Sequence, residues 1–538
     1  MSATSTTTAR LGPAGWFGAG GAALISASSW WVGSVPHAWQ TRSPHQLDWF
    51  AIGSIGPRIA FYAGLALMTA VWLRVGRGVL SATTTSVRRL QRMALVWAAP
   101  IMVAVPLASR DLWAYAAQGR LIQRGFDPYT YAPIDVPGVF SENVSPGWVR
   151  SPAPYGPFWL GLDHAIAAAY GEHVVVAVFL LRLPVLAGLL LLLGAVPRLA
   201  GHAGLRPDRV LWLTVTNPFT IELVLGAGHN DLLMAGLMTA GAALALRPGP
   251  AVVVAVVAAA VMALAAGVKS PAFIGLAFVV PLVLSRPDDG SPRPGSRHVA
   301  LVIVSALLGG VVTFAAVSVG TGFGLGWVHQ VGTSAPLVNW LSLPTDAAIV
   351  SDALTGHLDG ASHLDDPMRH WRTAGLALSV LVVATVWLRA VLVATGKRTP
   401  SAPTARPNRC RPVIGRLGAA LLALTLLGPA VQLWYLLWAL PFLGSATLHR
   451  RAVIALVATQ TAMVFTVDPH GLSFTMKPIV IAIIVLSAVV AWLTLRDVDL
   501  RASPAADDDP HRARAGVHAD RGRDFRGDQA GKPRKPFP

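Results

Sequence analysis

The chain has 538 residues, of which 54% are hydrophobic and only 13% are charged. Soluble proteins average about 25% charged residues, so the composition excludes an ordinary soluble enzyme and predicts a polytopic membrane protein. The formal net charge of +17 does not imply a nucleic-acid partner, because most basic residues lie in short segments between apolar runs, as in cytoplasmic loops. Cys410 is the single cysteine, which excludes an internal disulfide and a cysteine-rich metal cage.

Apolar segments that approach or exceed the roughly 20 residues needed to cross a bilayer recur along the chain. They predict an all-α protein with about 12–14 transmembrane helices in one domain, residues 14–495. The predicted spans are 14–34, 52–73, 93–108, 173–197, 210–226, 229–246, 250–267, 271–285, 299–320, 373–394, 413–428, 431–446, 452–467 and 476–495. Residues 1–13 lack a strongly basic segment, so we expect a cytoplasmic N-terminus and an uncleaved first anchor.

Basic residues orient these spans, because Lys and Arg concentrate in cytoplasmic loops. Residues 74–92 and 397–416 each hold five Arg and no acid, and alternating spans place them on one side. The charged tail, 496–538, ends on that side and is predicted to be disordered. The opposite, extracytoplasmic side receives two long loops, 109–172 and 321–372, and such loops tend to be functional.

Ionisable residues occur within or beside several spans, where a charge is costly and therefore points to function. Arg182 lies about nine residues into its span, near mid-bilayer at a rise of about 1.5 Å per residue. The topology brings four other charged residues close to one outer surface, which predicts a single site. They are Glu222, Asp231, Lys269 and Lys477, with His229 and Asn230 directly before Asp231.

Structural interpretations of the same residues compete with this one. Arg182 and Glu222 could form an ion pair that satisfies two buried charges. The segment 229–231 could simply cap the helix that follows it. Lys269 could extend its ammonium group to the membrane interface.

The first outer loop begins with Arg110-Asp111, where the third span leaves the membrane. A stripe at helical spacing predicts a helix along the surface from Asp111 to about Arg124, with Asp111 as an N-cap, a catalytic group or both. The stripe consists of Leu112, Tyr115, Gly119 and Ile122. The apolar stretch 158–170 is predicted to be re-entrant or interfacial.

The chain contains neither a GxxxxGK[ST] loop, nor a dinucleotide-binding fingerprint, nor an HExxH zinc helix. A carboxylate at a membrane exit, close to cations, suits the transfer of a group from a lipid phosphate to a hydroxyl. The carboxylate would accept the hydroxyl proton, and the cations would stabilise the departing phosphate. The lipid tail of the donor would lie among the spans.

Several motifs resemble those of one family. The stretches 110–119 and 125–129 resemble the first outer loop of actinobacterial α-(1→6)-mannopyranosyltransferases. Further motifs match that family in order and spacing. They are Ala153-Pro154-Tyr155-Gly156-Pro157, Asn217-Pro218, Gly228-His229-Asn230-Asp231, Val268-Lys269-Ser270-Pro271 and Gln432-Leu433-Trp434-Tyr435-Leu436-Leu437-Trp438.

The resemblance implies a GT-C glycosyltransferase fold in the plasma membrane, with the active site on the extracytoplasmic side. It implies a polyprenyl-phosphate mannose donor, with decaprenyl as the polyprenyl group. The implied acceptor is an α-(1→6)-mannan of lipomannan and lipoarabinomannan assembly, carried on a lipid anchor. A β-linked donor sugar that becomes an α-mannoside implies inversion by a single displacement.

The resemblance also assigns roles to residues. Asp111 matches the acidic residue of the family's outer loop and would be the base. Many GT-C enzymes carry two adjacent acids there, whereas this chain has Arg110-Asp111, so a need for a divalent cation stays open and no metal ligand is assigned. The other assignments follow. Lys269 and Arg182 would bind the phosphate with Arg110 as a further contact, Glu222, His229, Asn230 and Asp231 would shape the site or hold the sugar, and Trp434 and Tyr435 would line a groove or anchor the membrane interface.

Other functions compatible with the sequence are an arabinosyl or protein O-mannosyl transferase of the same fold, and a transporter or lipid flippase. Two long outer loops and the lack of a visible inverted repeat disfavour a transporter. The sequence does not distinguish a chain-initiating from a chain-extending mannosyltransferase.

Overall fold

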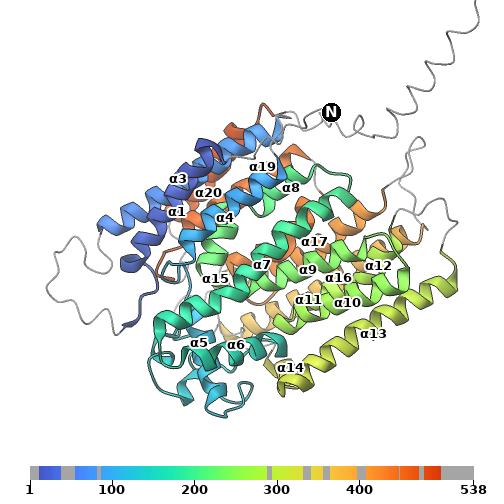
Figure 1. Ribbon diagram of the computed structural model, residues 1–538, viewed down its shortest axis with the longest axis horizontal. Coiled ribbons are helices and arrows are strands. Elements are labelled where there is room, and N and C mark those ends of the chain that lie inside the picture. The colour runs from blue at the N-terminus through green and yellow to red at the C-terminus, as the bar shows by residue number, and fades with distance from the viewer. Residues whose placement is uncertain are drawn as a thin grey trace, which may run out of the picture.

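The structure is a computed structural model that describes residues 11–37, 55–81, 86–286, 294–330, 341–354, 364–396, 408–446, 449–471 and 478–498. Every regular element within these ranges is a helix, which confirms the predicted all-α class. Figure 1 shows long helices running side by side, with a lobe of shorter helices, including α5 and α6, at one end of the bundle.

Within the described residues, six helices are long and apolar enough to cross a membrane, which confirms the polytopic membrane class. They are α3 (Ile55–Leu80), α7 (Val174–His202), α10 (Ala251–Val268), α13 (Ser296–Thr321), α16 (Asp365–Ala394) and α17 (Cys410–Leu427). The other long elements of the bundle are α1 (Gly12–Val32), α4 (Val87–Ile101), α9 (Asp231–Ala245), α19 (Arg450–Thr466) and α20 (Pro478–Leu495).

Three predicted spans are divided into shorter helices. Residues 210–226 form α8 (Pro207–Thr214) and the π-helix η4 (Phe219–Gly226), and residues 431–446 form η5 (Leu433–Tyr435) and α18 (Leu436–Gly444). Residues 271–285 form α11 (Ala272–Ala277) and α12 (Val279–Leu284).

Pro281 explains the break between α11 and α12. A proline ring clashes with the carbonyl four residues earlier and cannot donate a hydrogen bond to it. The carbonyl of Ala277 is therefore free of its usual helical partner, and it accepts a hydrogen bond of 2.9 Å from Trp387 Nε1 on α16. This bond joins α16 to the broken helix pair, and both lie beside the site described below.

The two predicted outer loops contain helices of their own. The first holds α5 (Asp111–Gln123), η2 (Pro133–Asp135), η3 (Ser141–Asn143) and α6 (Pro157–Tyr170), and the second holds α14 (Trp327–Gln330) and α15 (Leu343–Leu354). The helix predicted to start at Asp111 is confirmed. The expectation that this helix lies along the surface and packs through a single stripe is wrong. Between Leu112 and Ile122, α5 is buried on nearly every face, and it packs against α6 and α7.

Glycines let α7 and α9 approach closely. A Cβ atom on Gly188 would lie 2.3 Å from the carbonyl oxygen of Leu232, and one on Gly236 would lie 2.5 Å from the carbonyl oxygen of Gly188. Small residues at such contacts are typical of membrane helix pairs. Because Leu232 directly follows Asp231, this contact also fixes where the first turn of α9 lies.

Candidate active site

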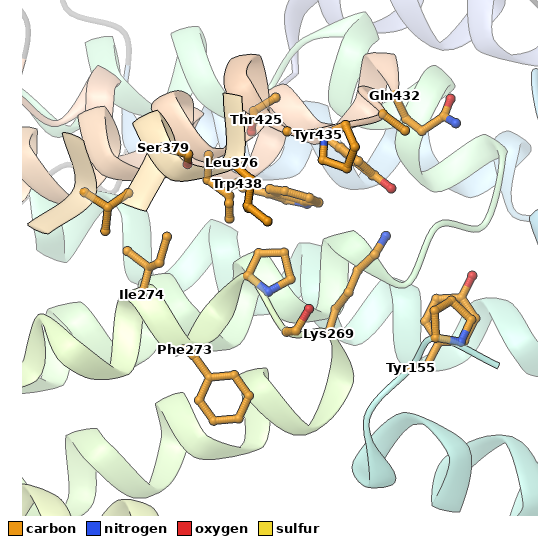
Figure 2. Close-up of a pocket in the computed structure, with 18 of the residues that line it drawn as sticks. Tyr155, Lys269, Phe273, Ile274, Leu376, Ser379, Thr425, Gln432, Tyr435 and Trp438 are labelled. Atoms are coloured by element: carbon orange, nitrogen blue, oxygen red, sulfur yellow. The ribbon is translucent and has the colours of Figure 1, made fainter. Parts of the chain in front are cut away.

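A cavity of about 840 Å³ lies between α5, the end of α10, α11, α16, α17 and α18. Figure 2 shows Tyr155, Lys269 and Gln432 on one side of it and Phe273, Ile274 and Leu376 on the other. The first side carries polar and charged groups, including Asp111. The second side is largely apolar, and part of its wall on α16, Leu376 and Val380, is also exposed at the surface of the molecule.

Asp111 is the first residue of α5 and lines the polar side of the cavity. Its backbone N–H donates to Ser109 Oγ over 3.1 Å, and its Oδ2 atom lies 3.2 Å from His229 Nδ1. Burial alone raises the pKa of the Asp111 carboxyl, but the contact with His229 and the charge of Lys269 outweigh burial and hold this pKa below its ordinary value. Its side chain therefore faces the site as a carboxylate, and Arg110, not Asp111, is the N-cap.

Lys269 forms the cationic centre of the cavity. It lies at the end of α10, and its ammonium group donates to both carboxylate oxygens of Asp231, at 2.9 and 3.0 Å. Trp438 Nε1 donates to the same carboxylate over 2.6 Å. The ammonium also lies 4.7 Å from the ring centroid of Tyr435 and 5.9 Å from that of Tyr155, which are cation–π distances. Figure 2 shows it reaching into the space between these two rings.

His229 lies between Asp111 and the aromatic wall of the cavity. Its ring stacks on Trp434 with centroids 3.6 Å apart, while its Nδ1 atom contacts Asp111. Asn230 is the N-cap of α9, but its side chain makes no capping hydrogen bond, so capping alone does not explain the 229–231 segment. The structure therefore brings together Asp111, His229, Asp231, Lys269, Trp434 and Tyr435, with the buried amide of Asn230 beside them.

Three other predicted site residues, Arg182, Glu222 and Arg110, belong neither to the cavity lining nor to this group, whereas His229, Asn230 and Asp231 belong to the group without lining the cavity. Arg182 is fully buried and donates to the carbonyl oxygens of Met102, Ala104 and Gly226. Glu222 is buried in η4, and no ion pair joins it to Arg182 in the described part of the chain. The expected Arg182–Glu222 pair is therefore wrong.

Arg110 is not among the residues that line the cavity, and it donates to the carbonyl oxygen of Asn143. Lys477 lies outside the described residues. The outer site predicted from topology thus keeps Asp231 and Lys269 and does not include Glu222.

Comparisons with known proteins match this chain to one family. Residues 15–285 match the family described as alpha-(1->6)-mannopyranosyltransferase, N-terminal domain, and residues 344–497 match the MptB C-terminal domain. Alpha-(1->6)-mannopyranosyltransferase A of Mycobacterium tuberculosis is 32% identical over 505 residues, which cover 93% of each chain. The chain belongs to the α-(1→6)-mannopyranosyltransferase family. It is therefore a glycosyltransferase, as the resemblance predicted.

Two further relatives support the same family. A probable alpha-(1->6)-mannopyranosyltransferase of Mycolicibacterium smegmatis is 31% identical over 82% of this chain and 80% of its own length. Alpha-(1->6)-mannopyranosyltransferase B of Corynebacterium glutamicum is 30% identical over 72% of this chain and 64% of its own length. No solved structure matches the chain.

Sequence reasoning missed some residues of this α-(1→6)-mannopyranosyltransferase family site. Gln118 lines the cavity together with Asp111 and Ala114, at helical spacing that could have revealed it. Its Oε1 atom is buried without a hydrogen-bond partner among the described residues. Trp438 lies one turn after Trp434, within the motif 432–438, and its Nε1 atom donates a hydrogen bond to Asp231. Among the described residues, no three His, Cys, Asp or Glu side chains gather closely enough to hold a metal.

Proposed function

We propose that this protein transfers mannose from polyprenyl phosphomannose, with decaprenyl as the polyprenyl group, to an α-(1→6)-mannan acceptor. The acceptor would belong to lipomannan and lipoarabinomannan assembly, and the reaction would take place at the extracytoplasmic face of the plasma membrane. The observation that carries the proposal is one cavity that holds a carboxylate and a lysine at its polar side and an apolar wall at the other. These are the parts that a lipid-phosphate donor and a hydroxyl acceptor need.

The carboxylate of Asp111 is the general base in this proposal. Its lowered pKa keeps it deprotonated at neutral pH, so it can accept the proton of the acceptor's 6-hydroxyl group. The acceptor oxygen forms a bond to C1 of mannose, the bond from C1 to the phosphate oxygen breaks, and the polyprenyl phosphate leaves with the bonding electrons. A single displacement of this kind inverts the β-linked donor sugar to an α-mannoside.

Lys269 stabilises the negative charge that develops on the departing phosphate. Asp231 and the surrounding aromatic rings hold its ammonium group in place. A positively charged group fixed before the reaction needs no reorganisation when the phosphate leaves, which is the source of its catalytic value. Asp231 acts through Lys269, because the carboxylate is fully buried behind the ammonium.

The apolar wall receives the lipid tail of the donor. On α16 it presents one stripe at helical spacing, and the surface exposure of Leu376 and Val380 indicates that the cavity is open sideways along this helix. An isoprenoid chain could enter from the bilayer there while its phosphate reaches Lys269. The stripe consists of Leu376, Ser379, Val380, Val383 and Trp387.

The test is Asp111→Asn in membranes supplied with labelled polyprenyl phosphomannose and a short α-(1→6)-mannoside. Loss of a general base lowers rates by about 10²–10⁴-fold, so turnover should fall at least about a hundredfold while the melting temperature is kept. Asp135→Asn is the matched control, because Asp135 lies in the same lobe but outside the cavity lining. Retained turnover in a folded Asp111→Asn protein would remove the base assignment, and transfer from a nucleotide-linked mannose alone would remove the lipid donor.

A further inference from the structure

Three segments that are far apart in the sequence meet directly behind Asp111. The backbone N–H of Ala108 donates to the carbonyl oxygen of Pro469 over 2.8 Å. Ser34 Oγ lies 2.9 Å from the carbonyl oxygen of Ser109 and 3.0 Å from that of His470. Residues 108–110, which we call the elbow before α5, are thus tied to the turn after α19 and to the segment that follows α1.

The same elbow is tightly constrained. Ala108 has a φ of 58°, which is uncommon for a residue other than glycine and persists only where the surroundings enforce it. Gly471 packs so closely that a Cβ atom there would lie 3.0 Å from both the Cα and the nitrogen of Ser109. The turn 468–471 therefore determines the direction in which the chain enters α5 and presents Asp111.

Arg110 and His470 make a side-chain contact between this turn and the start of α5 that depends on protonation. Arg110 Nη2 lies 3.2 Å from His470 Nε2, and His470 Nδ1 lies 2.8 Å from the carbonyl oxygen of Gly33. A carbonyl oxygen only accepts and a guanidinium only donates. Nδ1 must therefore carry the proton and Nε2 must accept, so the geometry requires a neutral ring.

We propose that His470 is a positioning residue, which holds Asp111 through Arg110 only while its imidazole is neutral. Protonation of Nε2 would direct an N–H group at the guanidinium of Arg110, across a distance of 3.2 Å. The hydrogen bond would be replaced by two facing donors with like charge. The elbow would lose this contact, and the carboxylate of Asp111 would lose part of its alignment. The proposal rests on the role of Asp111 given above.

The other charged groups around His470 act in both directions. Asp468 Oδ1 accepts the backbone N–H of His470 over 2.8 Å and favours the imidazolium, while Arg58 on α3, 3.4 Å from Asp468, and Arg110 disfavour it. Burial, followed by the charge of Arg110, lowers the pKa of His470 below its ordinary value. For a group whose pKa falls on folding, the contact is complete above its ordinary pKa and is lost as the pH drops through the lowered value.

The experiment measures kcat/KM between about pH 5 and pH 8, the range in which histidine titrates. Wild-type activity should fall about tenfold toward the acid end, as expected for the loss of a hydrogen bond to a charged group. His470→Gln places an amide oxygen near the position of Nε2 that can accept from Arg110 but cannot titrate. This variant should keep its activity and lose most of the acid decline. His370→Gln, at an exposed histidine on α16, is the control and should keep the decline.

Hydrogen exchange in the wild-type protein tests the same contact without any variant. Protection factors of the amides in residues 108–115, corrected for intrinsic exchange, should fall in acid with the same midpoint as the activity. Unchanged protection, or an acid decline that persists in His470→Gln, would overturn the positioning role. If protection falls but activity does not, the contact exists and the assignment of Asp111 as the base is the part that fails.

Discussion

Lys269 and Arg182 are both cations in or beside apolar helices, yet the side chain of Lys269 is 13% exposed and that of Arg182 is fully buried. Lys269 lies on the wall of the cavity, paired with the carboxylate of Asp231 and surrounded by aromatic rings. Arg182 lies away from any carboxylate that it could pair with in the described ranges, and its guanidinium joins carbonyl oxygens at the ends of α4 and η4. The charge of Lys269 thus belongs to the candidate site, and the charge of Arg182 stabilises the fold.

The difference shows what decides the role of a buried charge. A charge in or beside an apolar helix is the same sequence signal in both cases, so this signal alone does not identify a catalytic group. The partners do. A cation that already satisfies several backbone carbonyls has few donors left for a ligand, whereas an ammonium group held by one carboxylate at a cavity wall can still face an incoming anion.

Lys269→Met should give the largest effect in this comparison. Removal of one preorganised charge from the departing group costs about 10²–10³-fold in kcat. The measurement is turnover with labelled lipid-linked mannose, with the melting temperature followed in parallel. A variant that keeps more than about a tenth of wild-type kcat would show that Lys269 does not act on the leaving group.

Arg182→Met should unfold the protein more readily without changing the activity of the molecules that stay folded. It leaves the carbonyl oxygens of Met102 and Ala104 without this donor and leaves that of Gly226 with the backbone N–H of Leu107, at a cost of roughly 3 kcal/mol in stability. The check is thermal unfolding in detergent, with kcat per folded molecule. Arg198→Met, on the same helix but exposed, is the control and should change little.

The opposite outcome for Arg182 is equally informative. A stable Arg182→Met protein with a large loss of kcat would return Arg182 to the phosphate-binding role that the sequence suggested. The contrast between the two cations would then disappear.

A smaller effect is expected from Trp438→Phe. The indole N–H of Trp438 donates to Asp231, and phenylalanine keeps a ring stacked on Tyr435 but loses that donor. One such hydrogen bond to a charged group is worth about 1.5 kcal/mol, roughly tenfold. Trp434→Phe is the matched control, because Trp434 Nε1 has no partner among the described residues. Equal kinetic losses in the two variants would show that the bond to Asp231 is not what matters.

Part of this arrangement could be predicted from sequence. Apolar run lengths predicted the membrane class, and helical spacing predicted α5 from its first residue, Asp111. The distribution of basic loops predicted that Asp231 and Lys269 approach the same surface, and in the structure they are 2.9 Å apart. These features depend on local composition or on the number of membrane spans between two residues, and both can be read directly from the sequence.

Other parts depend on three-dimensional contacts that no local pattern records. The start of α5 is fixed by a turn 360 residues further along the chain, which appears in the sequence as an ordinary Asp-Pro-His-Gly loop. Arg182 and Glu222 looked like a pair because both are charges in apolar runs. The actual partners of Arg182 depend on where α4 and η4 end, because its guanidinium donates to the carbonyl oxygens of Met102 and Gly226 there.

The contact between Arg110 and His470 also bears on the order in which the protein is made. Ribosomes add about 5–20 residues per second, so His470 is synthesised roughly 20–70 s after Arg110, since 360 residues separate them. A nascent chain that already holds Asp111 and Lys269 has the contact of Ser34 with Ser109 but lacks the turn 468–471, which also holds the start of α5. The start of α5 would thus gain its full set of contacts only after α19 and the turn that follows it have been made.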